Sequence, residues 1–264
     1  KQTKPMIWVD EVCWNEFEPC GELDLRTQSS FCQAIEKQLR RILYQWNHFQ
    51  CDSVVEPVLY SPPCIADHGI GIQIRERTIE SEQDNEVVSH QYERQFDDEE
   101  DIEKIAFPEI THDAAASEEL YQVYRHLFDG VIDVEKGGLA GFWFAPWDDI
   151  VRLLGAEETL LSLIARPQFS HKLVSRIVEI YLHCLDQYEE LGLLASNNTN
   201  MRIGSGAYGY TRELPQVDCD PLRFRPADLW GCAAAQIFSS VSPAMHEEFA
   251  LQYERRWLER FGLS

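Results

Sequence analysis

The sequence predicts an α/β fold in which helices cover a mainly parallel sheet. Short apolar runs alternate along the chain with longer segments whose apolar residues recur at helical spacing. No internal repeat and no linker divides the 264 residues, so we expect a single domain over 1–264. Acidic and aromatic residues follow several of the apolar runs, which is where α/β barrels present their chemistry.

The predicted strands are short. Pro5–Val9, Ser53–Leu59 and Leu139–Phe144 are apolar runs bounded by polar or glycine residues, and each predicts a buried strand. Gly69–Arg75 alternates between apolar and polar residues and predicts one strand of a hairpin. About four to five strands are visible in this way, whereas a closed barrel of this class needs eight.

The predicted helices are longer and more regular. Four segments carry apolar residues at helical spacing: 29–49, 114–128, 169–191 and 242–262. One side of the third segment carries Leu173, Ile177, Ile180, Tyr181, Cys184 and Tyr188. Residues 97–101 are all acidic and predict the start of a further short helix, because the helix dipole favours acids there.

The final helix has the clearest start, stripe and stop. Ser242 can cap free backbone N–H groups, and Pro243 loses no hydrogen bond at the first helical position. The apolar stripe recurs every four residues, at Met245, Phe249, Tyr253, Trp257 and Phe261. Charged residues, Glu254 among them, fill the other faces, and Gly262 ends the helix.

The chain is strongly acidic, with 45 Asp and Glu against 23 Lys and Arg and a formal net charge of −22. Such a surface repels nucleic acid and anionic membranes, so we expect neither as a partner. No apolar run approaches bilayer length and no signal peptide is present, which predicts a cytoplasmic protein. The 8 cysteines include no C-x-x-C pair, which favours reduced thiols over a structural zinc ribbon.

Three motifs occur together near the C-terminus: D-L-W-G at 228–231, S-P-A-M-H-E-E-F at 242–249 and Y-E-R-R-W at 253–257. In this combination they resemble the uroporphyrinogen decarboxylase superfamily, which contains porphyrin decarboxylases and the methyltransferases that serve corrinoid proteins. Further matches precede them in the family's order: K-P-M-I-W-V-D at 4–10, C-D-S-V-V-E-P at 51–57, G-I-G-I-Q-I at 69–74 and G-F-W-F-A-P-W-D at 141–148. The resemblance therefore covers nearly the whole chain.

The resemblance implies a (β/α)8 TIM barrel of the uroporphyrinogen decarboxylase type. The helix that starts at Ser242 ends where another barrel strand is expected to begin. We therefore expect a barrel that is incomplete at its C-terminus.

The residues that follow the first predicted strand differ between the enzymes of this superfamily. The porphyrin decarboxylases carry R-Q-A-G-R-Y there, and their arginines suit substrate carboxylates. This chain has Asp10, Glu11 and Trp14 in that region, and its acids would repel a polyacid. We therefore expect a methyltransferase that moves a methyl group from a small O- or N-methyl compound to a corrinoid protein. The alternatives are a porphyrin-type decarboxylase, which needs no cofactor, and a non-catalytic barrel that binds a small molecule.

The methyltransferase branch also implies a zinc ion on His and Cys ligands, which would lower the pKa of a methyl-accepting thiol. The chain has no H-x-C motif, and we expect the zinc ligands beyond Ser264. Cys64 and His68 have usable spacing, but a chance pairing is the simpler interpretation. The expected partners are a small-molecule substrate and a corrinoid protein, with a second copy in a homodimer as a further candidate.

The candidate site residues lie at the ends of predicted strands and in the loops that follow them. For catalysis we expect the carboxylates of Asp10, Glu56 and Asp228. For substrate binding we expect Glu11, Trp14, Trp147, Asp148, Tyr208 and Trp230. Together with Trp143, two of these tryptophans (14 and 147) would line an aromatic pocket suited to a methoxylated ring or a quaternary amine.

These candidates also have structural interpretations. Asp228 would cap a turn and Trp230 would belong to the core, although their place among the ordered motifs favours function. Glu56 would be the buried partner of Arg75 or Arg202, because an unpaired carboxylate in an apolar strand is costly.

Overall fold

The computed structural model of the chain describes residues 5–14, 17, 21–79 and 89–264. Of these residues, 44% are helical and 13% lie in strands, so helices dominate the fold. The chain divides into two compact units. The small unit comprises residues 1–56 and 79–89, and the large unit comprises residues 57–78 and 90–264.

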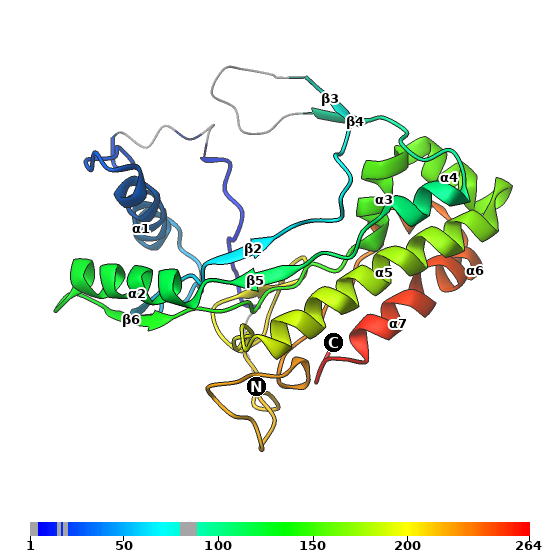
Figure 1. Cartoon of the computed structure of the whole chain (residues 1–264). Helices are drawn as coiled ribbons and strands as arrows, with labels where there is room; N and C mark the ends of the chain where they lie inside the picture. Colours follow the sequence, from blue (N-terminus) through cyan, green and yellow to red (C-terminus); the bar gives the residue numbers. More distant parts are fainter. Residues whose placement is uncertain (1–4, 15–16, 18–20, 80–88) are drawn as a thin grey trace. The chain divides into compact units, whose positions relative to one another are not determined.

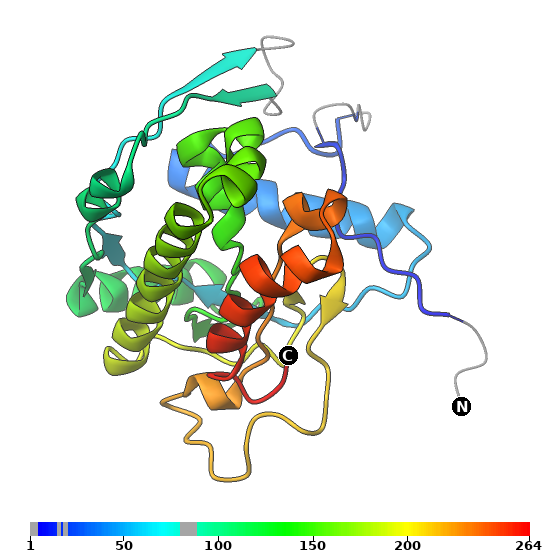
Figure 2. The same cartoon turned by 90° about the vertical axis from the view of Figure 1, so that its right-hand side faces the viewer.

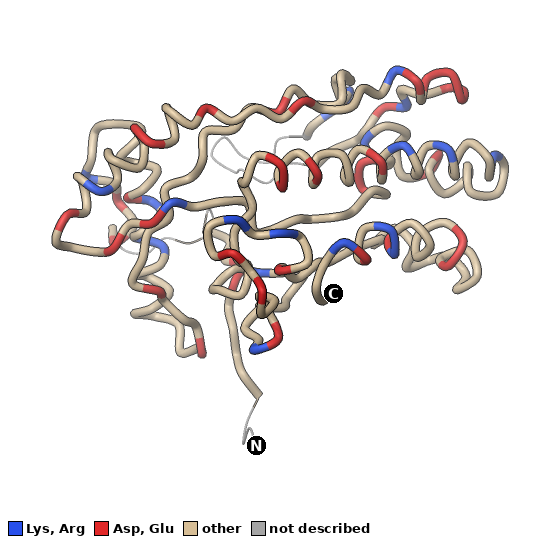
Figure 3. Tube along the Cα trace, turned by 60° about the horizontal axis from the view of Figure 1, so that its bottom comes forward, with Lys and Arg blue, Asp and Glu red and all other residues tan. Residues whose placement is uncertain are grey.

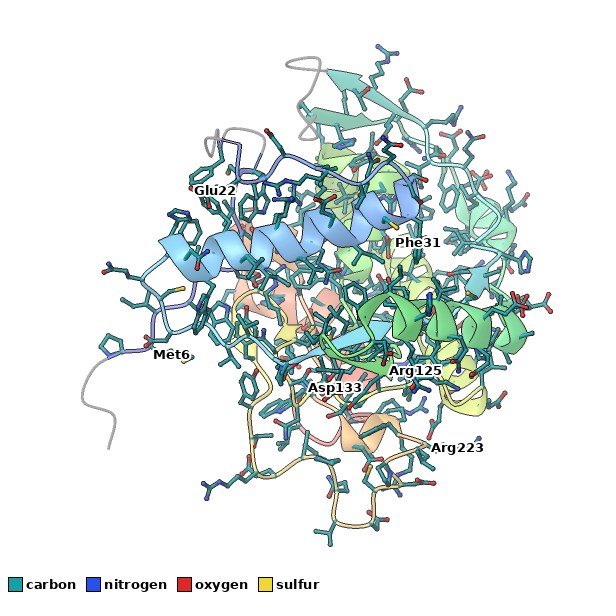
Figure 4. All side chains as sticks on the ribbon, turned by 90° about the vertical axis from the view of Figure 1, so that its left-hand side faces the viewer. Met6, Glu22, Phe31, Arg125, Asp133 and Arg223 are labelled. Atoms are coloured by element: carbon teal, nitrogen blue, oxygen red, sulfur yellow. The ribbon has the colours of Figure 1, made fainter. Side chains whose placement is uncertain are left out.

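The small unit contains helix α1, Ser30–His48 (Figure 1). Glu36 on this helix fastens the chain that precedes it, because its carboxylate accepts from the backbone N–H of Thr27 at 2.9 Å and from its hydroxyl at 2.8 Å. These hydrogen bonds are the main reason that the pKa of Glu36 falls to about 2. Figure 4 shows the side chains of α1 and of the preceding segment, with Glu22 and Phe31 labelled.

The strands within the described residues pair only two by two. The pairs join β1 (Val58–Ser61) with β6 (Asp133–Lys136), β2 (Ile65–Asp67) with β5 (Ile110–His112), β3 (Glu76–Ile79) with β4 (Ser89–Tyr92), and β7 (Arg202–Ile203) with β8 (Ala207–Tyr208). The β1–β6 pair is parallel, and the β2–β5 and β7–β8 pairs are antiparallel (Figure 1).

The helices of the large unit form two groups along the chain, separated by a long irregular stretch. They are α2 (Ala114–Phe128), α3 (Pro146–Leu154), α4 (Ala156–Ala165), α5 (Pro167–Glu190), α6 (Pro243–His246) and α7 (Gln252–Leu258). Shorter 3₁₀ turns span Glu99–Lys104, Pro226–Asp228 and Gln236–Ser240. α5 and α7 lie side by side (Figure 2). Among the described residues, no helix combines the length and apolarity that crossing a membrane requires.

Two buried tryptophans join the helices of the large unit to the rest of its core. Trp257 on α7 stacks on Phe144, with ring centroids 4.8 Å apart and an angle of 7° between the planes. Its indole N–H donates to the carbonyl of Cys232 at 3.1 Å. The indole N–H of Trp147 on α3 donates to the carbonyl of Phe249 at 2.9 Å. Each indole thus buries an aromatic body without leaving its polar group unsatisfied.

The predicted (β/α)8 barrel is wrong. Within the described residues the sheets have two strands each and none closes into a barrel. Of the predicted strands, 53–59 corresponds only to β1, which starts at Val58, while 5–9 and 139–144 are not regular strands. β6 had no counterpart in the predicted strands, because its sequence, Asp133–Lys136, contains three charged residues and only one apolar residue, Val134.

Beside residues 139–144, the predicted third strand, the side chain of Asn197 forms hydrogen bonds of the kind that a neighbouring strand would form. Leu139 forms one parallel bridge, to Leu194, and the ladder stops there. Asn197 then donates from Nδ2 to the carbonyls of Ala140 (3.1 Å) and Trp230 (2.8 Å), and its Oδ1 accepts from the Trp230 N–H (2.9 Å). The backbone polar groups are satisfied in this way without a continuous sheet.

The helix predictions are largely confirmed. The predicted helices 29–49, 114–128 and 169–191 correspond to α1, α2 and α5, with ends that agree within two residues. The acidic segment 97–101 does start a short helix: Asp98 accepts from the backbone N–H of Glu100 at 3.0 Å. Both α3 and α4 lie in a region for which no helix was predicted.

The final helix, predicted over 242–262, ends earlier, at Leu258, and is interrupted in its interior. A π-helical turn, Glu247–Leu251, separates α6 from α7. A π turn adds a residue to the helical repeat and so rotates the side chains that follow it. Glu254, expected on a polar face, is only 6% exposed, and burial raises the pKa of its carboxyl despite the nearby His246.

Replacing Asn197 tests the role of its side chain in the large unit. Asn197→Ala removes three hydrogen bonds and leaves a buried N–H and two carbonyls without partners. We expect the free energy of unfolding to fall by about 3 kcal/mol in a denaturant titration. Asn197→Asp keeps the acceptor for the Trp230 N–H but loses both donated bonds, so it should also destabilise. A loss below about 0.5 kcal/mol for Asn197→Ala would contradict this role.

Replacing Glu254 tests the consequence of the π turn. The pKa of Glu254 is raised in the folded state, so folding disfavours its ionised form. The carboxylate therefore destabilises the protein at a pH above that pKa. This destabilisation disappears as the pH falls and the carboxyl becomes protonated. Glu254→Gln should therefore raise the free energy of unfolding by about 1 kcal/mol at neutral pH, with a gain that shrinks as the pH falls through the raised folded-state pKa and is gone below about pH 4. The exposed Glu259→Gln is the control and should change little. A loss of stability in Glu254→Gln at neutral pH would disprove the interpretation.

Candidate functional site

A cavity of about 490 Å³ lies in the large unit among α3, α5, α7 and segments 67–74 and 141–143. From α5 it is lined by Ile177, Ile180, Tyr181, Cys184, Leu185 and Tyr188. Trp257, Phe142 and Trp143 add three further aromatic rings. We call this cavity the aromatic pocket. Its volume and its mostly apolar lining with a few polar groups are typical of small-molecule sites.

One carboxylate in the aromatic pocket is held in a fixed position. The hydroxyl of Tyr181 donates to Oδ2 of Asp149 at 2.7 Å, and Nη1 of Arg152 lies 3.4 Å from Oδ1. Asp149 stands in the first turn of α3, where the helix dipole favours a negative charge. Burial, followed by the charge of Asp149, raises the pKa of Tyr181, so this phenol keeps its proton and remains a donor.

A second part of the pocket wall is a thiol and a phenol that also stay protonated. Burial raises the pKa of Cys184 to about 11, and the carboxylate of Asp67 acts in the same direction. Burial likewise raises the pKa of Tyr188, with smaller contributions from Cys184 and Asp67. Because the thiolate is the reactive form of cysteine, this thiol is unsuited to nucleophilic attack at neutral pH.

A smaller cavity of about 140 Å³ shares segment 141–143 with the aromatic pocket. Asn197, Gly204 and Trp230 are among the residues that line it. The indole N–H of Trp230 is buried and has no hydrogen-bond partner within the described residues. Trp230, predicted to bind substrate, thus lies beside a cavity, but one much smaller than the aromatic pocket.

The other predicted site residues of the large unit have mainly structural surroundings. Trp147 is buried in the core and bonded to the Phe249 carbonyl. Asp148 lies in the first turn of α3; burial raises its pKa, while its interaction with Trp143, a residue of the aromatic pocket, lowers it. Tyr208 lies half-buried on β8. Asp148 is therefore the member of this group that the structure connects with the pocket.

Asp228 is held by an arginine. Its Oδ2 accepts from the backbone N–H of Arg225 at 3.0 Å and from Nε at 2.9 Å, and its Oδ1 accepts from Nη2 at 3.1 Å. Arg225 also binds both oxygens of Asp218, at 3.1 and 3.0 Å. The hydrogen bonds from Arg225 lower the pKa of Asp228, although burial opposes them. The carboxylate of Asp228 therefore stays ionised, and its hydrogen bonds to Arg225 stabilise the turn at Pro226–Asp228.

The remaining predicted site residues belong to the small unit. Trp14 packs edge-on against Tyr44, with ring centroids 6.1 Å apart, and the guanidinium of Arg41 lies 5.2 Å from its ring centroid. Asp10 and Glu11 are exposed on the segment before it. Glu56 is half-buried and stands just before β1 rather than inside a strand. The aromatic residues around Trp14 form a cluster within the small unit.

The zinc ion implied by the sequence resemblance finds no matching donor set here. Within the described residues, no three His, Cys, Asp or Glu side chains are arranged to hold a metal ion. Cys64 donates its backbone N–H to the hydroxyl of Ser117, and His183 packs edge-on against Phe107. No chemical step is therefore assigned to zinc.

The sequence interpretation missed Asp149 and the role of the α5 residues. Tyr181, Cys184 and Tyr188 were placed on one face of the helix, which is correct, but as ordinary core. The available signal was that three residues with polar atoms share one apolar stripe, although this alone does not indicate a cavity. Comparison of the chain with protein-family models, curated proteins and solved structures returned no match. The aromatic pocket is thus the geometry from which a function has to be inferred.

The pairing of Asp228 with Arg225 predicts a defined pH dependence of stability. Because the folded-state pKa of Asp228 is lowered, its carboxylate stabilises the fold above its ordinary pKa, and this contribution is lost as the pH falls through the folded-state value. Asp228→Asn should lower the free energy of unfolding by about 1–2 kcal/mol at neutral pH, since Arg225 itself is partly exposed. The two proteins should converge once the pH has fallen through the lowered folded-state pKa, which lies below the ordinary aspartate value of about 3.9.

Asp218→Asn is the matched control, because it removes a carboxylate from the same arginine at a side chain that is 75% exposed. We expect a change below about 0.5 kcal/mol for this variant. Equal effects of Asp228→Asn and Asp218→Asn at neutral pH would refute a structural role that is specific to Asp228.

Proposed function

We propose that this chain is an enzyme that binds a small methylated compound in the aromatic pocket and takes part in transferring its methyl group to a corrinoid carried by a partner protein. The observation that carries the proposal is the aromatic pocket itself, with Asp149 fixed at its wall by Tyr181. The transfer reaction is suggested by the ordered motifs that include D-L-W-G at 228–231. The corrinoid would supply the methyl acceptor.

The size and shape of the pocket support a ring-bearing or compact ligand. A volume of about 490 Å³ accommodates a substituted ring, and five aromatic side chains surround it. Several of these rings are packed against one another: Phe142 lies 6.2 Å from Tyr188 and 6.0 Å from Trp257, centroid to centroid. Rings that are held by neighbours offer their faces to a ligand at a small entropic cost.

The charges of the pocket make a polyanionic substrate unfavourable. Arg152 is the cationic side chain that lines it, and this arginine already lies close to Asp149. Asp67 and Asp149 contribute two carboxylates. A porphyrin with several carboxylates would meet repulsion in this pocket without enough arginines to bind them. The pocket therefore supports the methyl-compound proposal over the decarboxylase alternative.

Binding is tested first. We expect para-methoxyphenol or para-hydroxyphenyl trimethylammonium to bind the intact chain with a measurable Kd in isothermal titration calorimetry. Cys184→Phe fills the pocket from its wall and should weaken binding by about tenfold or more. The control is Leu161→Phe on the exposed face of α4, which should bind as the parent does. Equal binding by Cys184→Phe and the parent would place the ligand elsewhere.

Catalysis is tested separately with the methyl acceptor. The chain is incubated with cob(I)alamin and methyl-labelled donors of the O- and N-methyl classes, and the label is followed. We expect label to move to the cobalamin with at least one donor, and Cys184→Phe to lower the rate in proportion to its loss of binding. Binding without any transfer across the panel would reduce the function to ligand binding.

A further inference from the structure

The charges around the aromatic pocket are predominantly negative and come from two places. Asp149 borders Tyr181, and the charge of Asp67 acts on Cys184 and Tyr188. Tyr181 and Tyr188 are seven residues apart on α5, which corresponds to about 10 Å along the helix axis. The two carboxylates therefore act on different ends of the same wall.

The cationic side chain at the pocket does not neutralise both carboxylates. Arg152 is 51% exposed, and its Nη1 lies 3.4 Å from Asp149, which is itself 31% exposed. An ion pair with this exposure is weak, because solvent competes with it. Asp67 accepts from the backbone N–H of Gly69 at 2.7 Å, which leaves its charge in place. Acidic residues also lie along most of the described chain, as Figure 3 shows.

Two hydrogen-bond donors at the pocket, Tyr181 and Trp257, are already committed to protein acceptors. The hydroxyl of Tyr181 donates to Asp149, and the indole of Trp257 donates to the carbonyl of Cys232. An acceptor that used these two donors would have to displace their bonds, whereas a cation could use carboxylate oxygens and ring faces that are already in place.

We propose that the aromatic pocket selects an organic cation, with a methylated ammonium group placed against aromatic rings and near Asp149 or Asp67. The inference rests on the proposed function, because it concerns the same pocket, and it narrows the donor from O- or N-methyl compounds to N-methyl compounds. Ring faces attract such a cation through their quadrupoles, and the nearby carboxylates add a longer-range attraction.

The test uses two ligands that have nearly the same shape and differ in charge. The cation is para-hydroxyphenyl trimethylammonium, and its neutral counterpart is para-tert-butylphenol. We expect the intact chain to bind the cation about tenfold more tightly at low ionic strength, with a smaller preference in high salt because both carboxylates are partly exposed. Isothermal titration calorimetry gives both dissociation constants.

Two variants then test whether the carboxylates cause the preference for the cation. Asp149→Asn and, independently, Asp67→Asn should each reduce the ratio of the two dissociation constants by threefold or more while leaving the affinity for the neutral ligand nearly unchanged. Either variant suffices if the other fails to fold. Glu179→Gln removes an exposed carboxylate that bonds Ser175 on α5 and does not line the pocket, so it should keep the parent ratio.

The outcomes separate the inference from the proposed function. Binding of the neutral ligand as tightly as the cation, or more tightly, would overturn the cation preference and leave the pocket as a binding site. An unchanged ratio in both Asp149→Asn and Asp67→Asn would also overturn it. Failure of both ligands to bind the parent would remove the proposed function together with this inference.

Discussion

The large unit depends on the burial of Trp257. Its ring stacks on Phe144, its N–H satisfies the carbonyl of Cys232, and one of its edges lines the aromatic pocket beside Tyr181. One side chain thus joins the last helix, an irregular core segment and the ligand cavity. Because interiors are packed as densely as organic crystals, the positions of α5 and α7 around the pocket are coupled through this ring.

Much of the helical structure could be predicted from the sequence, but little of the sheet structure could. The apolar spacing of 114–128 and 169–191 predicted α2 and α5 because a helical repeat is a local property of the sequence. The apolar run 139–144 looked like a strand because of its composition. Only Ala140 and Phe144 in it are buried, and its hydrogen bonds go to distant partners such as Asn197. Partners so far apart in the chain leave no local pattern. The π turn that buries Glu254 is equally invisible to a period of 3.6 residues.

In the candidate site, too, residue types could be predicted from the sequence, whereas their long-range partners could not. Asp228 and Trp147 had the residue types and positions of functional groups, yet the structure gives them an arginine and a backbone carbonyl as partners. Asp149 is a neighbour of the predicted Asp148, and only the packing of α3 against α5 brings it to the hydroxyl of Tyr181. A pocket is a property of tertiary packing, so the sequence indicated some of its lining residues, such as Trp143 and Tyr181, but neither Asp149 nor the site as a whole.

The central claim is that ligand binds between α5 and segments 67–74 and 141–143. A crystal structure of the full chain with para-hydroxyphenyl trimethylammonium tests this most directly. The account predicts the ammonium group within about 6 Å of a ring of the aromatic pocket, on the side of Asp149 or Asp67. Ligand density beside Trp14 in the small unit, or in the small cavity at Trp230, with the aromatic pocket empty, would contradict it.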